Sequence, residues 1–303
     1  MILVAGSANL DFVVRAARIP GPGETVLGRD FQTFPGGKGA NQAVACARAG
    51  GVPTRMLLAL GDDAAARSIE ASLAAAGVTQ QVVRVADEAT GTAFICVSDD
   101  AENAITVAPG ANARLRPADL PPLAGVTHLL LQLETPLETV TAHARAARAA
   151  GVTVVLNAAP AHALPAALLD AVDVLVVNEG ELVAIVGLPA GAARGADGLE
   201  AALARVTVPT VIVTLGARGC RARHHGESLA LPAFAVEALD TTAAGDTFCG
   251  ALVAALSQGS ALAPALRRAS AAAALACTRL GAQASIPSRA EVDAFLTSQS
   301  EAP

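Results

Sequence analysis

The residues best suited to chemistry lie in a run of small residues that leads into an apolar stretch. Residues 240–250 read DTTAAGDTFCG. A small-residue turn at a helix start leaves backbone N–H groups free to hold an anion, and those of Ala243, Ala244 and Gly245 are the candidates. Asp246 follows them, either as a group that acts on a substrate held there or only as the helix cap, a role that aspartate favours. The run therefore predicts a phosphate pocket with a carboxylate beside it.

A second glycine turn, GGKGANQ over residues 36–42, also leads into a predicted helix. It is not a Walker A loop, because Lys38 is followed by Gly39 where that motif needs serine or threonine. No G-x-G-x-x-G follows the first strand, so a dinucleotide fingerprint is missing too. The glycines favour close approach of backbone to a ligand, with Lys38 and Asn41 supplying polar side chains. A tight strand-to-helix turn without a ligand is the alternative.

Polar side chains also follow several predicted strands. Asn9 and Asp11 come after the strand over residues 2–5 and share one face if the chain stays extended. Glu134 follows the strand over residues 128–132. Ligands of open α/β sheets bind beyond the carboxyl ends of the strands, and these groups suit vicinal hydroxyls. Each residue alone is more often a turn former or an exposed polar residue.

Two further polar runs are NEGE over residues 178–181 and TLGARG over residues 214–219. Both begin at the carboxyl ends of strands, so we expect both to face the same crevice as Asn9 and Asp11. Amide and carboxylate oxygens there can order a hydrated Mg²⁺ ion, which is bound chiefly through phosphates. A solvated helix start is the alternative for Glu179 and Glu181.

The elements that must position these residues alternate along the chain. Short apolar strands are predicted over 2–5, 128–132, 152–156, 174–177 and 211–215, and helices over 41–49, 64–76, 137–150, 199–205 and 248–256. Gly50, Gly77 and Gly151 close several helices at the position where glycine is favoured. Strands that read as continuous apolar runs are buried on both faces. The sequence thus predicts an α/β fold, a mostly parallel sheet with helices on both faces.

Two stretches, over residues 12–34 and 92–107, break this alternation. They contain short alternating runs joined by turn residues at 20–23 and 99–103. We expect them to form a small antiparallel β-sheet that acts as a lid and excludes water during transfer chemistry. Without a repeat or an interdomain linker, residues 1–303 are predicted to form a single domain with the lid inserted in it.

Composition excludes several classes of function. The 303 residues are 53% hydrophobic and carry a net charge of −6, with no Trp or Tyr, so nucleic-acid binding is disfavoured. The five cysteines contain no C-x-x-C pair, and neither disulfides nor a zinc cluster are expected. His224 and His225 have no spaced acidic or thiol partners, so we do not predict a metal there. The absence of G-x-S-x-G gives serine-hydrolase chemistry no support.

The expected location is the cytoplasm. The amino terminus, MILVAGSANLD, has no positive segment and only a short apolar run, which predicts no signal peptide. The longest apolar stretch, over residues 261–280, contains Pro264, Arg267 and Arg268. A bilayer-spanning helix would bury those charges in lipid, so a core helix is expected and no membrane partner.

The motifs taken together resemble the ribokinase family of carbohydrate kinases, also called the PfkB family. GGKGANQA over residues 36–43 and DTTAAGDTF over 240–248 are similar to its two signatures, in the right order. GSANLD, QLETPLE and LGAQASIP, over residues 6–11, 132–138 and 280–287, extend the likeness over nearly the whole chain. The resemblance implies a Rossmann-like domain with a β-lid, ATP as donor with Mg²⁺, D-ribose as acceptor giving ribose 5-phosphate, an activating K⁺ ion and a homodimer. The lids would close that dimer, since exposed lid faces carry apolar residues such as Phe12 and Phe94.

The same resemblance implies a role for each matching residue. The sugar site would comprise Asn9, Asp11, Gly37, Lys38, Asn41 and Glu134, with Asp246 as catalytic base and the amides of Ala243, Ala244 and Gly245 as an anion hole. The magnesium and phosphate region would comprise Asn178 and Glu181, and the nucleotide loop Thr214, Gly216 and Gly219. The K⁺ site would comprise Asp240, Thr242, Ala276, Arg279, Gly281 and Ser285. In-line positioning and charge stabilisation, which such parts supply, dominate phosphoryl transfer.

Three positions depart from the family pattern, and three alternatives stay open. Ser270 stands where histidine is frequent, Ala217 where serine is common, and Leu280 where lysine occurs, which affects the adenine wall and nucleotide affinity. A related kinase for deoxyribose, fructose or a nucleoside is the first alternative. A catalytically silent sugar-binding regulator is the second, although Asp246 and the complete turn before it argue for catalysis. A dehydrogenase is the third and lacks its fingerprint.

Overall fold

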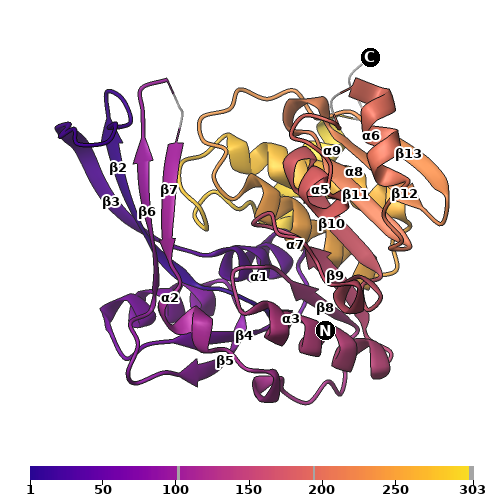
Figure 1. Ribbon diagram of the computed structural model, residues 1–303, viewed down its shortest axis with the longest axis horizontal. Helices are drawn as coiled ribbons and strands as arrows, with labels where there is room; N and C mark the ends of the chain where they lie inside the picture. The colour runs from indigo at the N-terminus through magenta and orange to yellow at the C-terminus, as the bar shows by residue number, and fades with distance from the viewer. Residues whose placement is uncertain (101–102, 194, 300–303) are drawn as a thin grey trace.

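The computed structural model describes residues 1–100, 103–193 and 195–299, and its centre is a large sheet (Figure 1). Its strands are β1 (Ile2–Ala5), β4 (Thr54–Leu60), β5 (Thr79–Arg84), β8 (His128–Leu131), β9 (Thr153–Asn157), β10 (Val174–Asn178), β11 (Thr210–Thr214), β12 (Cys220–His224) and β13 (Glu227–Leu231). They lie in the order β13-β12-β11-β10-β9-β8-β1-β4-β5. The strands from β11 to β5 are parallel, and β12 and β13 add an antiparallel edge. The carboxyl ends of the parallel strands therefore meet along one edge.

Helices cover both faces of this sheet. One face packs against α1 (Lys38–Arg48), α2 (Ala64–Ala75), α7 (Ala244–Ser257), α8 (Leu262–Cys277) and α9 (Arg289–Ser298), and the other against α3 (Leu137–Ala149), α4 (Ala166–Leu169), α5 (Glu179–Val186) and α6 (Gly195–Leu203). In β1, Ile2 and Val4 contribute to the first core and Leu3 and Ala5 to the second. Burial on both faces is why these strands read as unbroken apolar runs. The predicted fold class is confirmed.

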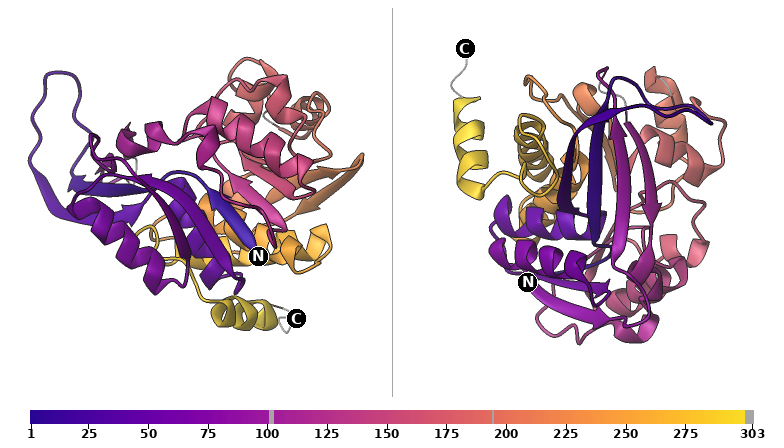
Figure 2. Two further views of the ribbon diagram at one scale, coloured as in Figure 1. Left: turned by 90° about the horizontal axis from the view of Figure 1, so that it is seen from below. Right: turned by 90° about the vertical axis from the view of Figure 1, so that its left-hand side faces the viewer.

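A smaller sheet projects to one side of the large one (Figures 1 and 2). Its strands, in the spatial order β3-β2-β6-β7, are β2 (Asn9–Ala16), β3 (Gly28–Gly36), β6 (Gly91–Val97) and β7 (Asn103–Ala108). The outer pairs are antiparallel as predicted, but β2 pairs with β6 in parallel. Both strands start beyond the carboxyl ends of parallel strands, β1 and β5, and so leave the large sheet in the same direction. Of the turn expected over 99–103, residues 101 and 102 lie outside the described part of the chain.

Other predicted features lie at the edges of the fold. The alanine-rich stretch over 261–280 is α8, which buries one face, while Arg267 lies over the ring of Phe234 at 5.2 Å. Within the described residues, no helix is long and apolar enough to cross a membrane, and no cluster of His, Cys, Asp and Glu has the makings of a metal site. His224 and His225 stack edge to face with ring centroids 4.5 Å apart. The sequence analysis named neither β4 and β5, which continue the large sheet beyond β1, nor the β12–β13 hairpin at its other edge.

Candidate active site

The predicted base, Asp246, lies in the first turn of α7 and is buried. Ala243 precedes the helix in a left-handed conformation, φ 58°, which turns the chain sharply into α7. Helix α7 packs closely on α1, because Gly250 lets the two backbones approach. A Cβ at that position would lie 2.4 Å from the Cβ of Ala45 and 2.6 Å from the carbonyl oxygen of Gln42. The glycine turn over 36–42 and the turn before Asp246 thus meet at one place.

Two amide side chains of α1 hold the carboxylate of Asp246. Asn41 Nδ2 donates to its Oδ2 at 3.0 Å, and Gln42 Nε2 donates to its Oδ1 at 2.9 Å. Asn41 and Gln42 are buried, and Asn41 Oδ1 is buried without a partner among the described residues. Hydrogen bonds from both amides fix the plane of the carboxylate, and an unpartnered buried acceptor beside it is a group that a ligand hydroxyl would satisfy.

A second carboxylate, Asp11, lies on β2 close to the first. Gly36 makes room for it, since a Cβ there would lie 2.1 Å from Asp11 Oδ2. Burial, together with the negative charges of Glu134 and Asp246, raises the pKa of Asp11 from 3.8 to about 7. The three acidic groups therefore share one small volume although they come from three distant parts of the sequence. Such crowding is typical of functional sites rather than of structural ones.

The third carboxylate, Glu134, is anchored at one oxygen. Ser7 Oγ donates to Glu134 Oε2 at 2.6 Å, and the backbone N–H of Lys38 donates to the same oxygen at 3.1 Å. The Lys38 ammonium supplies the counter-charge, since attraction by Asp246 raises its pKa in spite of burial, and Glu134 and Glu181 add to the effect. One lysine thus lies among carboxylates of both the predicted sugar site and the predicted phosphate region.

Asn9 is oriented by a residue that sequence reasoning did not single out, Asn112. Asn112 Nδ2 donates to Asn9 Oδ1 at 2.8 Å and to the carbonyl oxygen of Ala8 at 3.1 Å, while its Oδ1 accepts from the N–H of Ala8 at 3.0 Å. It lies in a 3₁₀ helix at Gly110–Arg114 and is fully buried. Gly91 on β6 leaves space for this amide pair. The sequence signal was the polar residue in PGANAR, which directly follows the lid segment.

The anion hole agrees with the sequence prediction only in part. The N–H groups of Ala243 and Gly245 have no partner among the described residues, and Gly245 is exposed. The prediction that the N–H of Ala244 is free is wrong for this structure, because it donates to the carbonyl oxygen of Thr241 at 3.2 Å. This bond closes the four-residue turn into α7. The role of Ala244 in holding an anion stays a prediction.

The predicted magnesium and nucleotide residues lie at the carboxyl ends of β10 and β11. Asn178 and Glu181 form a reciprocal capping box, with Asn178 Oδ1 accepting from the N–H of Glu181 and Glu181 Oε2 accepting from the N–H of Asn178, both at 2.8 Å. Burial raises the pKa of Glu181. Thr214 pairs with Asn178 in the sheet, and its hydroxyl donates to the carbonyl oxygen of Val177 at 3.3 Å. The two runs are therefore neighbours, as expected.

The nucleotide loop follows β11 as a single 3₁₀ turn. Gly216 begins this turn and Gly219 follows it, with φ of 59° and 90°, so both positions favour glycine. Arg218 in this turn forms an ion pair with Glu179. The carboxylate of Glu179 therefore has a protein partner and is not simply solvated. A Cβ on Gly219 would meet the carbonyl oxygen of Leu231. Among the described residues, this loop forms no hydrogen bond or ion pair with the residues of the predicted sugar site.

Asp240 is joined by hydrogen bonds to two of the other predicted K⁺ residues, Thr242 and Gly281. Its Oδ1 accepts from the N–H of Thr242 at 2.9 Å, and its Oδ2 accepts from the N–H of Gly281 at 3.0 Å. Burial acts to raise the pKa of Asp240, but these hydrogen bonds outweigh it and hold the pKa below its usual value. The Ser285 hydroxyl is buried and donates to the carbonyl oxygen of Ala282. The side chain of Arg279 turns away to pair with Glu291, so only its backbone remains near Ala276, whose carbonyl oxygen accepts from its N–H.

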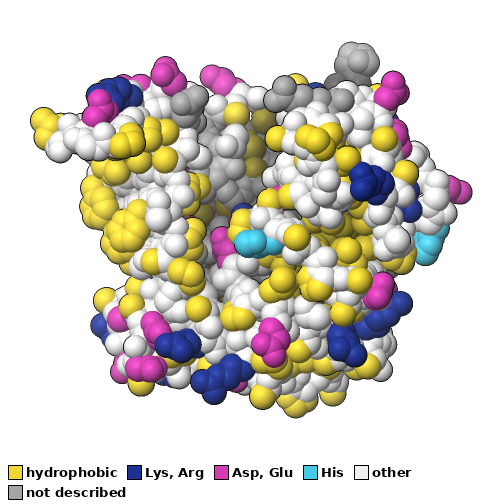
Figure 3. All heavy atoms as spheres, viewed as in Figure 1, with side chains coloured by type: hydrophobic (Ala, Val, Ile, Leu, Met, Phe, Trp, Pro, Cys, Tyr) yellow, Lys and Arg dark blue, Asp and Glu magenta, His cyan; other side chains and the backbone are white. Residues whose placement is uncertain are grey.

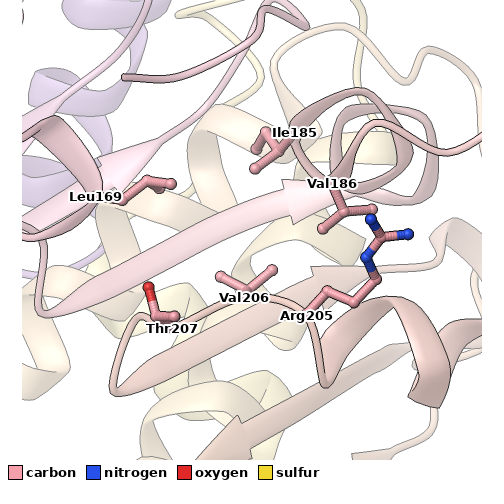
Figure 4. A pocket seen from close by; sticks show the side chains of 6 residues that line it. All are labelled: Leu169, Ile185, Val186, Arg205, Val206 and Thr207. Atoms are coloured by element: carbon pink, nitrogen blue, oxygen red, sulfur yellow. The ribbon is translucent and has the colours of Figure 1, made fainter. Parts of the chain in front are cut away.

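The surface of the molecule is hollowed between the lid and the layers of the large sheet, and charged side chains of both signs lie inside the hollow (Figure 3). A separate cavity of about 200 Å³ is lined by Leu169, Ile185, Val186, Arg205, Val206 and Thr207 (Figure 4). Its residues precede β10 and β11 or end α5. It therefore lies at the opposite edge of the sheet from the candidate site.

The three departures from the family pattern lie on α8, in the nucleotide loop and beside Gly281. Ser270 on α8 bonds to the thiol of Cys220, whose pKa burial raises. Ala217 is exposed in the nucleotide loop, and Leu280 is exposed beside the loop that contains Gly281. Among the described residues, none of the three forms a hydrogen bond with Asp11, Glu134 or Asp246.

Comparison with known proteins gives a consistent result. Residues 1–289 match the family described as pfkB family carbohydrate kinase. The chain is 40% identical over 301 residues to the ribokinase of Haemophilus influenzae, covering 97% of this chain and 98% of that protein. It is 33% identical over 302 residues to a deoxyribokinase of Salmonella typhi, covering 98% of each. The solved structure of Arabidopsis thaliana ribokinase complexed with ribose and ATP is similar, with a TM-score of 0.87, 34% identity, and coverage of 97% of this chain and 98% of that one.

Proposed function

The chain belongs to the pfkB family of carbohydrate kinases, and from this premise we propose that it transfers a phosphoryl group from ATP to the 5-hydroxyl of D-ribose, giving D-ribose 5-phosphate. One observation carries the proposal. A buried carboxylate, Asp246, stands at the start of a helix with its plane fixed by two amides, and two further carboxylates, Asp11 and Glu134, lie close by. Relatives described as ribokinases support ribose as the acceptor.

Asp246 acts as the general base in this proposal. Its carboxylate takes the proton of the primary hydroxyl as the oxygen attacks the terminal phosphorus of ATP, and the bond from that phosphorus to its bridging oxygen breaks, so that ADP leaves. Asp11 and Glu134 accept hydrogen bonds from the secondary hydroxyls, and the NH₂ group of Asn9 donates one, so that the sugar is oriented, with Gly37, Lys38 and Asn41 closing the other side. Asn112 holds Asn9, and Ser7 and the N–H of Lys38 hold Glu134, so these two groups need little rearrangement when the sugar binds.

Stabilisation of the transferring group falls to the start of α7 and to Lys38. The free N–H groups of Ala243 and Gly245, with that of Ala244 once its turn opens, would face the negative oxygens of the phosphoryl group. Lys38 adds a positive charge near Asp246 and Glu181. When bound with ATP, Mg²⁺ would neutralise phosphate charge. The oxygens of Asn178 and Glu181 fit a hydrated Mg²⁺, because the capping box leaves Glu181 Oε1 without a bond among the described contacts.

A K⁺ ion fits the loop around Asp240 by the chemistry of its donors. The set offers a carboxylate, the Ser285 hydroxyl and the backbone carbonyl groups of Thr242, Ala276, Arg279 and Gly281, which are all oxygen donors of the kind that hard cations prefer. The cation would hold the Asp240 segment, and through it the turn that presents the N–H groups of Ala243 and Gly245. Thr214, Gly216 and Gly219 would contact the nucleotide.

We propose further that two chains associate through their lids. Phe12 stacks on Phe94 and on Phe31, with ring centroids 5.3 and 6.2 Å apart. Phe12 lies next to Asp11 on β2, so the aromatic face points away from the sugar side. Phe31 and Phe94 are 64% and 55% exposed, and Ile105 is 54% exposed, which is a large apolar area for one small sheet. A homodimer would cover this apolar area. Within each chain, residues 1–303 would form a single domain in which the lid segments over 12–34 and 92–107 are inserted. The use of ATP supports a cytoplasmic location.

A panel of acceptors tests the proposal. Purified protein with ATP and Mg²⁺ should show its highest kcat/KM with ribose, against 2-deoxyribose, fructose and a nucleoside, and ³¹P NMR of the product should report a primary phosphate ester. The deoxyribokinase relative makes 2-deoxyribose the second candidate. A higher kcat/KM with 2-deoxyribose would overturn the choice of ribose. Ribose binding without ATP consumption would favour a regulator instead.

A further inference from the structure

The side chain of Gln42 is hydrogen-bonded to three other side chains in the interior and has no exposed surface. Its Nε2 donates to Asp246 Oδ1 and to Asn157 Oδ1, both at 2.9 Å, and its Oε1 accepts from Gln132 Nε2 at 2.7 Å. Asn157 ends β9 and Gln132 directly follows β8, so two strands of the large sheet meet on one helical side chain. Because Gln42 is wholly buried, it contacts no substrate and acts on the reaction only through Asp246.

The polarity of this chain of amides is set by the backbone. Asn157 Nδ2 donates to the carbonyl oxygen of Val176 on β10 at 3.2 Å, and a carbonyl oxygen only accepts. Asn157 must therefore turn its own oxygen toward Gln42, and Gln42 must in turn present its NH₂ group. At the other end, Gln132 donates to Gln42 Oε1, which favours the same orientation. If the Gln42 amide were flipped, its oxygen would face the oxygens of Asp246 and Asn157. It would also lose the hydrogen bond from Gln132.

We infer that Gln42 is a positioning residue for the catalytic base, oriented by Asn157 and through it by the backbone of β10. With the NH₂ group of Gln42 on Oδ1 and that of Asn41 on Oδ2, the carboxylate of Asp246 is held at both ends. Asn41 belongs to the predicted sugar site, whereas Gln42 lies behind the base. Loss of Gln42 therefore frees the carboxylate to rotate without removing a sugar contact. The inference rests on the proposed role of Asp246.

The test is a steady-state comparison with the sugar that the wild-type protein phosphorylates fastest. Gln42→Met replaces the amide by an apolar chain of similar length and should lower kcat about 10–100-fold, because a small misplacement of a reacting group has effects of that order. The KM values for the sugar and ATP should stay within about threefold. Asn157→Leu removes the group that orients Gln42, and its kcat should fall less, about 3–10-fold, since Gln132 still holds the amide.

Thr139→Val is the matched control, because it removes one buried side-chain hydrogen bond, to the carbonyl oxygen of Leu115 on another part of the fold, and should leave kcat unchanged. Full kcat in folded Gln42→Met would overturn the inference. So would a sugar KM that rises in proportion to the loss of kcat, which is the behaviour of a collapsed site. If Gln42→Met does not fold, unchanged kcat in Asn157→Leu overturns it. A wild-type protein inactive with every sugar would refute the proposed function, and the inference with it.

Discussion

Replacing Asp11 by asparagine should make the protein more stable at alkaline pH while damaging sugar recognition. In the folded chain, burial and the nearby charges of Glu134 and Asp246 raise the pKa of Asp11 from 3.8 to about 7. No hydrogen bond to its carboxylate is found among the described residues. The asparagine keeps the shape of the side chain and removes a charge that folding leaves buried and repelled.

The magnitude follows from linkage between protonation and folding. A pKa raised from 3.8 to about 7 corresponds to about 4 kcal/mol of unfavourable free energy once the carboxylate is ionised. The sign is that of a raised pKa. Below pH 3.8 both states are protonated and Asp11 costs nothing. As the pH rises from 3.8 toward 7, the free-energy cost of the buried carboxylate grows and the folded chain loses stability. Above pH 7 the whole cost is present. The gain from Asp11→Asn should therefore be about 1–2 kcal/mol at pH 5 and about 3–4 kcal/mol at pH 8.

Urea unfolding of wild-type protein and Asp11→Asn at both pH values measures this difference without ligands. Asp63→Asn is a control of opposite sign. Burial acts to raise the pKa of Asp63, but hydrogen bonds from Thr90 and Ala66 outweigh it and lower the pKa, so its replacement should destabilise the protein. An Asp11→Asn variant that is less stable than wild type at pH 8 would refute the account of the carboxylate cluster.

Sugar binding should change in the opposite direction. If Asp11 accepts hydrogen bonds from two hydroxyls, each worth about 1.5–3 kcal/mol, calorimetry should show a ribose Kd raised at least about 100-fold while the Kd for ATP stays within a few-fold. The preference for ribose over 2-deoxyribose should also shrink, because no buried carboxylate is left unpaired by the missing hydroxyl. An unchanged ribose Kd in the folded variant would exclude Asp11 from the sugar site.

Three further predictions concern the residues around this cluster. Exchange of K⁺ for Na⁺ at constant ionic strength should lower activity, and Asp240→Ala should abolish the difference between the two salts; equal wild-type rates in both would exclude a K⁺ requirement. Asn112→Leu should raise the ribose KM about tenfold and leave the ATP KM unchanged, because Asn9 loses the amide that orients it; an unaffected ribose KM would show that Asn9 needs no such support. Phe94→Glu should convert the proposed dimer to monomers in sedimentation experiments, since it places a charge in the aromatic stack with Phe12; an unchanged sedimentation coefficient would rule out the lid as the interface.

The sequence predicted those features of the fold and site that depend on local patterns of residues. The apolar runs of β1, β8 and β10 are unbroken because both faces are covered, so a parallel sheet followed from them. The two glycine-containing motifs predicted that Asn41 and Asp246 belong to one site. The structure shows a hydrogen bond between these two side chains. The lid was recognised by its alternation, but its central parallel pairing depends on where β2 and β6 leave the large sheet.

What the sequence did not predict depends on contacts between distant residues. Gln42 and Asn112 are buried amides, and their partners Asp246 and Asn9 lie 204 and 103 positions away. No spacing rule identifies such pairs. The bond of the Ala244 N–H to Thr241 depends on the left-handed conformation of Ala243, which alanine adopts rarely. Asn178 and Glu181 fit a capping box as well as a phosphate site, and local sequence does not separate the two.

The central claim is that Asp246 is the general base, and Asp246→Asn tests it most directly. Ribose affinity by calorimetry and turnover by ³¹P NMR should be measured on the same preparation of wild-type protein and variant. We predict a ribose Kd within a few-fold of wild type and a kcat lower by about 10²–10⁴-fold, because the amide keeps the shape of the side chain but no longer accepts the proton. A folded variant that binds ribose and keeps a kcat within a few-fold of wild type would contradict the account.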